Sequence, residues 1–199
     1  MAWEAFQEGS IPVGSVITAG SGAVVAEGRN RAFGPPSGGL AGSAVAHAEM
    51  EALSQIPPGD YPDHTLWSSL EPCFMCSAAA VHSHVGSVSY AAADPLISGI
   101  DRLPSLNAWV ESRWPRRRGP LPGPIGAFAG LLPLVWLADR RPDGAVAATH
   151  READAATVDL AIRLARSGLG RAASVVEAFA RVAPVLMPAA PRRQPSEGG

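Results

Sequence analysis

The chain has 199 residues, of which 47% are hydrophobic and 17% are charged, and its formal net charge is −2. This length and hydrophobic content exclude a disordered chain and a small domain that depends on disulfides. Residues 1–100 carry 2 Arg and 9 acidic residues (−7), whereas residues 101–199 carry 14 Arg and 9 acidic residues (+5). This division argues against a uniformly basic surface for nucleic acid. It fits a basic second half that meets an anionic partner, or two halves that attract each other.

Short strands and helices alternate along the first half. A Gly20-Ser21-Gly22 turn signal separates two β-rich runs, and Pro57-Pro58 and Pro72 mark the end of one helix and the start of another. The elements expected here are, in chain order, a hairpin of strands at 13–19 and 23–27, a loop at 31–42, a helix at 43–55, a strand at 65–69, a helix at 73–82 and a strand at 86–92.

The second half is predicted to add mainly helices. Its expected elements are a helix at 105–113, a last strand at 131–137 and two amphipathic helices near 153–164 and 172–182. The alternation in the chain as a whole predicts an α/β sandwich around one sheet. We expect residues 1–100 to form the core, residues 101–187 to complete the domain and residues 188–199 to be a loose tail.

The sequence predicts a soluble, cytoplasmic protein. Acidic residues stand near the start, where a secretory signal needs basic and then apolar residues. The longest apolar stretch, 121–138, contains three prolines and is shorter than the roughly 20 residues that a membrane-spanning helix needs.

Two short motifs carry the chemistry, His47-Ala48-Glu49 and Pro72-Cys73-Phe74-Met75-Cys76. Cys73 and Cys76 are three residues apart and share one face of the first helical turn, where the helix dipole favours thiolates. Two thiolates and the His47 imidazole would give Zn²⁺ three ligands and leave the fourth tetrahedral position to water. Zinc bound in this way lowers the pKa of that water to about 7.

Glu49 is the candidate proton carrier. It lies two residues from His47 and could hydrogen-bond the water without binding the metal. It could take the water's proton, protonate a ring nitrogen and later protonate a leaving amine, which is the hydrolytic deamination of an aminated heteroaromatic ring.

Two alternatives use the same residues. The Cys73–Cys76 pair alone would also fit a thioredoxin-like redox pair. A structural zinc site would need a fourth protein ligand, for which His64, His82 or His84 is available. The combination of His-x-Glu with Pro-Cys-x-x-Cys is typical of zinc deaminases and favours a catalytic zinc ion.

The sequence resembles the cytidine deaminase superfamily, in its purine and tRNA adenosine deaminase branch, over roughly residues 4–100. The segments that carry the resemblance are IPVGSVI at 11–17, EGRNR at 27–31, AHAEMEAL at 46–53, SLEPCFMC at 69–76 and VHSHVG at 81–86.

The resemblance implies a three-layer α/β/α fold around a five-stranded mixed sheet, in a protein that is often dimeric. It implies His47, Cys73 and Cys76 as zinc ligands, Glu49 as the proton shuttle, and contacts from Asn30 and the Ala48 backbone to the base or sugar. Asn30 could instead cap its loop. We expect Glu71 to cap the following helix.

The chain departs from the family pattern at both ends of the similar region. It begins where the family's first helix is half complete, so this helix is short or the true start lies upstream. Beyond residue 100 no family motif is recognised. The basic segment Arg113–Arg118 could grip phosphates, but an exposed arginine-rich loop is the favoured interpretation.

We therefore expect a zinc-dependent hydrolytic deaminase of a free nucleobase or nucleoside, acting as a homodimer. The acidic first half would repel an RNA backbone, so a tRNA adenosine-to-inosine editing enzyme is the second candidate. A non-catalytic, zinc-stabilised interaction protein is the third. Residues 101–199 could cover the pocket or form a subunit contact.

Overall fold

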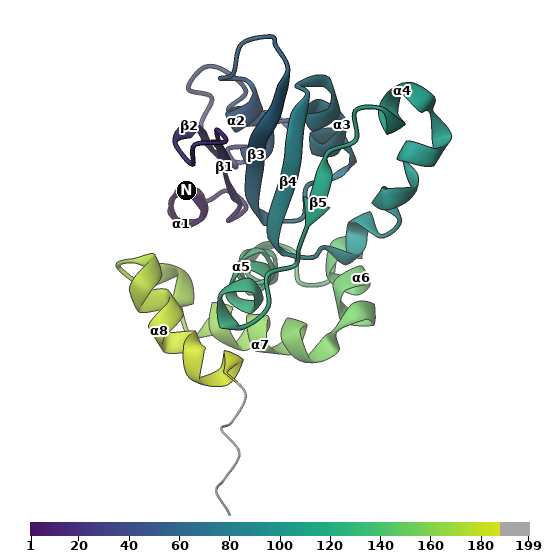
Figure 1. Ribbon diagram of the computed structural model, residues 1–199. Coiled ribbons are helices and arrows are strands. Elements are labelled where there is room, and N and C mark those ends of the chain that lie inside the picture. The colour runs from purple at the N-terminus through teal and green to yellow at the C-terminus, as the bar shows by residue number, and fades with distance from the viewer. Residues whose placement is uncertain (188–199) are drawn as a thin grey trace, which may run out of the picture.

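The computed structural model describes residues 1–187, in which five strands form one mixed sheet (Figure 1). The strand order is β2-β1-β3-β4-β5, with antiparallel pairing of β1 to β2 and β3 and parallel pairing of β4 to β3 and β5. The strands are β1 (Gly14–Thr18), β2 (Val24–Arg29), β3 (Tyr61–Leu70), β4 (Val85–Ala92) and β5 (Arg116–Arg118). The predicted α/β class and five-stranded mixed sheet are confirmed.

Eight α-helices accompany the sheet within the described residues. They are α1 (Ala2–Gln7), α2 (Ala48–Leu53), α3 (Phe74–His82), α4 (Ala108–Glu111), α5 (Pro124–Arg140), α6 (Ala145–Ala153), α7 (Ala155–Arg166) and α8 (Val175–Leu186). Short 3₁₀ helices lie at Pro95–Ile97, Ile100–Arg102, Pro104–Leu106 and Leu169–Arg171.

One face of the sheet is covered by α2 and α3 (Figure 1). Strand alternation turns Ile17, Leu66 and Val88 toward these helices, where they form a fully buried core with Ala52 and Ala80. The opposite face is covered in part. Helix α1 packs on β1 there, while the Trp67 side chain of β3 remains 46% exposed.

The helices of the second half build a separate hydrophobic cluster. Helix α5 packs against α7 and α8, and it also meets the carboxyl end of β4 beside Ala92. These helices lie beyond the end of the sheet and not over its face (Figure 1). The predicted amphipathic helices near 153–164 and 172–182 correspond to α7 and α8, whereas α6 was not predicted. The domain division at residue 100 stays a prediction, and the predicted tail at 188–199 lies outside the described residues.

The predicted strand at 131–137 is wrong, because this segment is the middle of the 17-residue helix α5. Apolar runs of this length do not distinguish a strand from a buried helix. The buried positions Phe128, Leu131, Leu132 and Val135 follow helical spacing. The helix also accommodates Pro133 in its interior, a residue type that normally argues against a helix.

The fifth strand is instead part of the arginine-rich segment, so the predicted exposed loop at Arg113–Arg118 is also wrong. Strand alternation in β5 turns Arg117 inward, with 8% of its side chain exposed, and leaves Arg116 and Arg118 outside. An Arg117 nitrogen lies 2.6 Å from a carboxylate oxygen of Glu71. Glu71 therefore binds Arg117 of β5. The expectation that it caps α3 is wrong, because α3 has no side-chain cap.

Two predicted helices are shorter than expected. The helix expected at 43–55 begins only at Ala48, because the backbone of His47 is extended (φ −76°, ψ 154°) and interrupts any helical turn before it. The helix expected at 105–113 is split by Asn107, whose side chain accepts from the amides of Trp109 and Val110 and caps α4.

Across residues 1–187, none of the helices has both the length and the apolar character that crossing a membrane would require.

Gly28 of β2 sets the distance between the sheet and α2. A Cβ atom there would lie 2.1 Å from the Ala48 carbonyl oxygen, so only glycine allows this approach.

We expect Gly28→Ala to lower the free energy of unfolding by about 1–3 kcal/mol, as overpacking does. The measurement is urea unfolding. Gly34→Ala is the control, because a Cβ atom there has no neighbour closer than 3.7 Å. Equal unfolding midpoints for the two variants would contradict the assigned packing.

Candidate metal centre and active site

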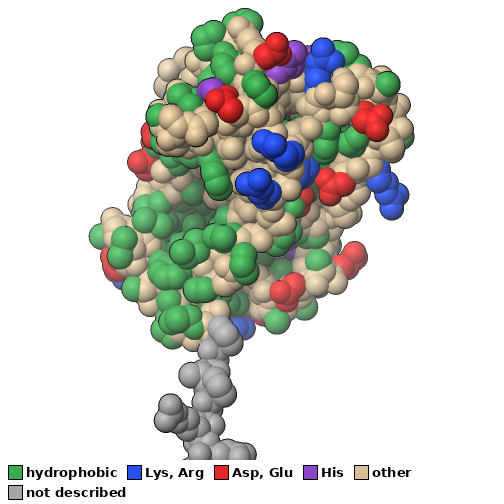
Figure 2. Space-filling model, in the orientation of Figure 1, with side chains coloured by type: hydrophobic (Ala, Val, Ile, Leu, Met, Phe, Trp, Pro, Cys, Tyr) green, Lys and Arg blue, Asp and Glu red, His purple; other side chains and the backbone are tan. Residues whose placement is uncertain are grey.

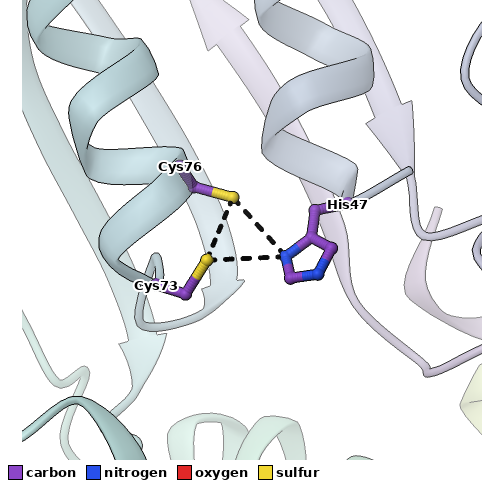
Figure 3. A group of neighbouring side chains, drawn as sticks. All are labelled: His47, Cys73 and Cys76. Carbon is purple, nitrogen blue, oxygen red and sulfur yellow. Dashed lines mark hydrogen bonds between the residues drawn. The ribbon is translucent and has the colours of Figure 1, made fainter. Parts of the chain in front are cut away.

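His47, Cys73 and Cys76 meet where two helices begin (Figure 3). His47 is the residue that precedes α2, Cys73 precedes α3, and Cys76 lies in the first turn of α3. The His47 Nδ1 atom lies 3.6 Å from Cys73 Sγ and 3.5 Å from Cys76 Sγ, and the two sulfurs are 3.6 Å apart. The structure thus brings together the three residues that the sequence predicts as metal ligands.

These separations fit a zinc ion. With Zn–S bonds of about 2.3 Å and Zn–N bonds of about 2.05 Å, a regular tetrahedron places two sulfurs about 3.8 Å apart and a sulfur and a nitrogen about 3.6 Å apart. The donor set of two thiols and one imidazole is also the kind that zinc prefers. The group therefore fits Zn²⁺ in both chemistry and spacing.

The surroundings favour a thiolate at Cys73. The hydrogen bond with the Cys76 thiol, followed by that with the His47 ring, lowers the pKa of Cys73 to about 4. The same contact with Cys73, together with burial, raises the pKa of Cys76. Cys73 is the N-cap of α3, where unpaired backbone amides also stabilise negative charge.

Glu49 lies beside the metal group and is only 3% exposed. One of its carboxylate oxygens accepts a hydrogen bond of 2.7 Å from the Ser68 hydroxyl of β3, and the other lies 3.4 Å from Cys76 Sγ. Burial raises the pKa of this carboxyl group. Sequence analysis did not identify Ser68, although the strand alternation that buries Leu66 also turns Ser68 toward α2.

The metal group has three members among the described residues, since no further His, Cys, Asp or Glu lies close enough to all three to join it. His64 and His84, considered above as fourth ligands, contact Asp63 and Asp60 instead. The His82 ring packs against the Trp109 ring at a tilt, with the ring centroids 4.9 Å apart. The arrangement leaves room for a non-protein ligand, as in catalytic zinc sites.

Of the two predicted substrate contacts, Asn30 lines the cavity and Ala48 does not. Asn30 is 3% exposed and lines the cavity that contains His47, Glu49 and Cys73. Its Oδ1 atom accepts a hydrogen bond from the Ala32 amide, so the loop-capping role is present. Ala48 is fully buried between His47 and Glu49 and is not among the residues that line the cavity.

The cavity beside the metal group measures about 800 Å³. His47 and Cys73 of the metal group, Asn30 and the end of β4 line one side. Side chains of α5, α6, α7 and α8 line the other, and these helices follow the region of family resemblance. Hydrophobic side chains gather over these helices on the face shown in Figure 2. Residues 101–199 were expected to cover the pocket or to form a subunit contact, and their helices do line the cavity, although the lining residues were not predicted.

Asp94 and His150 also line the cavity, and they lie 3.6 Å apart. Asp94 follows β4 and His150 belongs to α6, so this pair joins the two halves of the chain. Burial raises the pKa of Asp94 and lowers the pKa of His150. Nothing in the sequence pattern alone pairs these distant residues.

Residues 1–92 match the family model described as the cytidine and deoxycytidylate deaminase zinc-binding region. Among curated proteins, the chain is 32% identical over 112 residues to a tRNA(Ile)-lysidine synthase of Deinococcus radiodurans, with 54% of this chain and 18% of that protein covered. It is 35% identical over 81 residues to a cytosine deaminase of Candida albicans, with 39% and 50% covered. It is 31% identical over 106 residues to a tRNA-specific adenosine deaminase of Streptococcus pyogenes, with 51% and 58% covered.

The chain thus spans less than two thirds of the length of each of these curated relatives. A solved structure from work on A-to-I editing by tRNA:A34 deaminases is similar to it with a TM-score of 0.51 and 23% identity, over 64% of this chain and 91% of that one. At this identity the likeness concerns the fold. Residues 1–92, which contain the His47, Cys73 and Cys76 group, are thus similar to the zinc-binding region of cytidine and deoxycytidylate deaminases.

Proposed function

We propose that the chain is a zinc-dependent hydrolytic deaminase of an uncharged nucleobase or nucleoside. The observation that carries this proposal is a three-membered zinc-type group beside a buried carboxylate, Glu49, at a cavity that His47, Cys73 and Glu49 line. His47, Cys73 and Cys76 would hold the ion. When bound, zinc supplies the Lewis acidity that makes water nucleophilic near neutral pH.

Glu49 would move the protons of the reaction. It accepts one from the attacking water, delivers it to a ring nitrogen of the substrate, and in a second transfer protonates the leaving amine. The ring amine leaves as ammonia and a carbonyl replaces it, so one water is consumed for each ammonia released. The Ser68 hydrogen bond fixes the orientation of the carboxylate for both transfers.

Asn30 would hold the substrate ring in place. Its side-chain oxygen is already bonded to the Ala32 amide, so its NH₂ group is the part available to a ligand. Backbone N–H groups in the first turn of α2, including that of Ala48, have no partner within the helix and could donate to the substrate.

Charge in the cavity favours a substrate without phosphate. Four acidic side chains line it, namely Glu49, Glu71, Asp94 and Asp154, against a single guanidinium, that of Arg141. An RNA or nucleotide would bring phosphates toward these carboxylates. The wall formed by α5, α6 and α7 also encloses the space around the metal group, which suits a small molecule better than an anticodon loop.

Editing of tRNA adenosine is the second candidate, because the tRNA-specific adenosine deaminase is among the relatives of this chain. The arginine-rich segment gives it limited support, since Arg117 is bound to Glu71 and only Arg116 and Arg118 are exposed on β5. A homodimeric state and a cytoplasmic location stay predictions.

Glu49→Gln separates an enzyme from a non-catalytic zinc protein. The amide cannot accept and return a proton, so we expect ammonia release to fall by about 10²–10⁴-fold while the zinc content stays at one ion per chain. The measurements are an ammonia assay and elemental analysis. Glu51→Gln, on the same helix but outside the cavity, is the control and should keep its activity. An unchanged rate in the Glu49 variant would refute the proposed role.

A substrate panel separates small molecules from RNA. We expect the purified chain to release ammonia from at least one of adenine, guanine, cytosine or their nucleosides, and to act more slowly on an anticodon stem-loop, because carboxylates outnumber cations in the cavity. Both substrate classes are assayed at equal concentration. Turnover confined to the stem-loop would favour the tRNA-editing candidate over ours.

A further inference from the structure

The cavity is larger than the ring that the proposed reaction needs. Pockets of about 300–1,000 Å³ hold whole drug-sized ligands, and this one measures about 800 Å³. An aminated ring that reaches Glu49 and the metal group fills the end of the cavity next to α2 and α3. The rest of the space lies against the helices of the second half.

That remaining space is apolar. Leu134 and Leu137 of α5, Leu160 of α7 and Leu186 of α8 line it. These side chains also belong to the hydrophobic cluster of the helical half or pack against it, so the wall is part of a core and not an open surface. Val146 of α6, which is 41% exposed, adds to the same wall.

The polar groups on this side are few, and Arg141 is the single guanidinium among them. His150 is engaged with Asp94, and Asp154 caps α7 by accepting from Thr157. The hydroxyl groups of a sugar would gain less beside these leucine side chains than an apolar substituent would. A hydrocarbon or aromatic group would instead bury its apolar surface against these leucine side chains, which is favourable.

We propose that the substrate of this site is an aminated heteroaromatic ring that carries a large, uncharged apolar substituent. The inference rests on the proposed deaminase function and names its substrate class. The ring is placed by Asn30 and Glu49 at the sheet side, and the substituent lies along α5 and α7. The helices beyond the family-matched region thus determine specificity.

The test uses the zinc-loaded full chain and two series of probes, 1-alkylcytosines and 9-alkyladenines, with chains from methyl to octyl. Burial of one methylene corresponds to about a fourfold gain in affinity. We expect kcat/KM to rise by about two- to fourfold for each methylene until the cavity is full. The same series is titrated against the Glu49→Gln variant to measure binding without turnover.

Variants of the wall localise the effect. Ala127 on α5 and Val146 on α6 line the cavity with exposed side chains, so a larger residue there does not disturb a core. We expect Ala127→Phe and Val146→Trp each to lower the hexyl-to-methyl ratio of kcat/KM by at least about tenfold. Ala156→Phe, at an exposed position of α7 outside the cavity, is the matched control and should leave the ratio unchanged.

The outcomes separate this inference from the function on which it rests. Turnover of unsubstituted bases or nucleosides with no gain along the alkyl series would overturn the inference and leave the deaminase function standing. Binding that strengthens along the series, without ammonia release from any probe, would support the apolar site and refute the deaminase. A gain that persists in both wall variants would also count against the inference.

Discussion

The structure depends on the convergence of two helix starts at one end of the sheet. His47 and Cys73 are 26 residues apart in the chain, yet their ligand atoms lie 3.6 Å apart because α2 and α3 both begin there. Neither residue is held by a long helix, since α2 has six residues and α3 has nine. The sheet fixes the arrangement instead, through the close contact of Gly28 with α2 and the buried core of Ile17, Leu66 and Val88.

The same convergence places the Glu49 carboxylate, the proposed proton carrier, next to the metal group. Glu49 is on the first turn of α2 and is therefore carried along with His47, while Ser68 of β3 meets it from the sheet. A carboxylate in so buried a position would be costly if it had no partner. The hydrogen bond from Ser68 and the position beside the metal group offset this cost.

The site could be predicted because it is built from short local motifs. Contacts between segments that are distant in the sequence could not be predicted. His47, Glu49, Cys73 and Cys76 form two short patterns whose chemistry is apparent from residue type and spacing. The role of Arg117 depends on a three-residue strand and on its pairing with β4, and no local pattern indicates that. The segment at 131–137 was misassigned because a short apolar run does not distinguish a strand from a buried helix, although Phe128, Leu131 and Val135 follow helical spacing. The sequence analysis allowed residues 101–199 to cover the pocket but did not name the lining residues, since leucines on α5, α7 and α8 line the cavity only after these helices have packed.

The central claim is that three protein side chains bind zinc and leave its fourth position open. X-ray absorption at the zinc edge of the purified chain tests it most directly. The account predicts one zinc per chain, with two sulfur neighbours at about 2.3 Å and two nitrogen or oxygen neighbours at about 2.0–2.1 Å, one of which exchanges with added small ligands. A zinc ion held by four non-exchangeable protein ligands, or a chain purified and reconstituted with zinc that binds none, would contradict it.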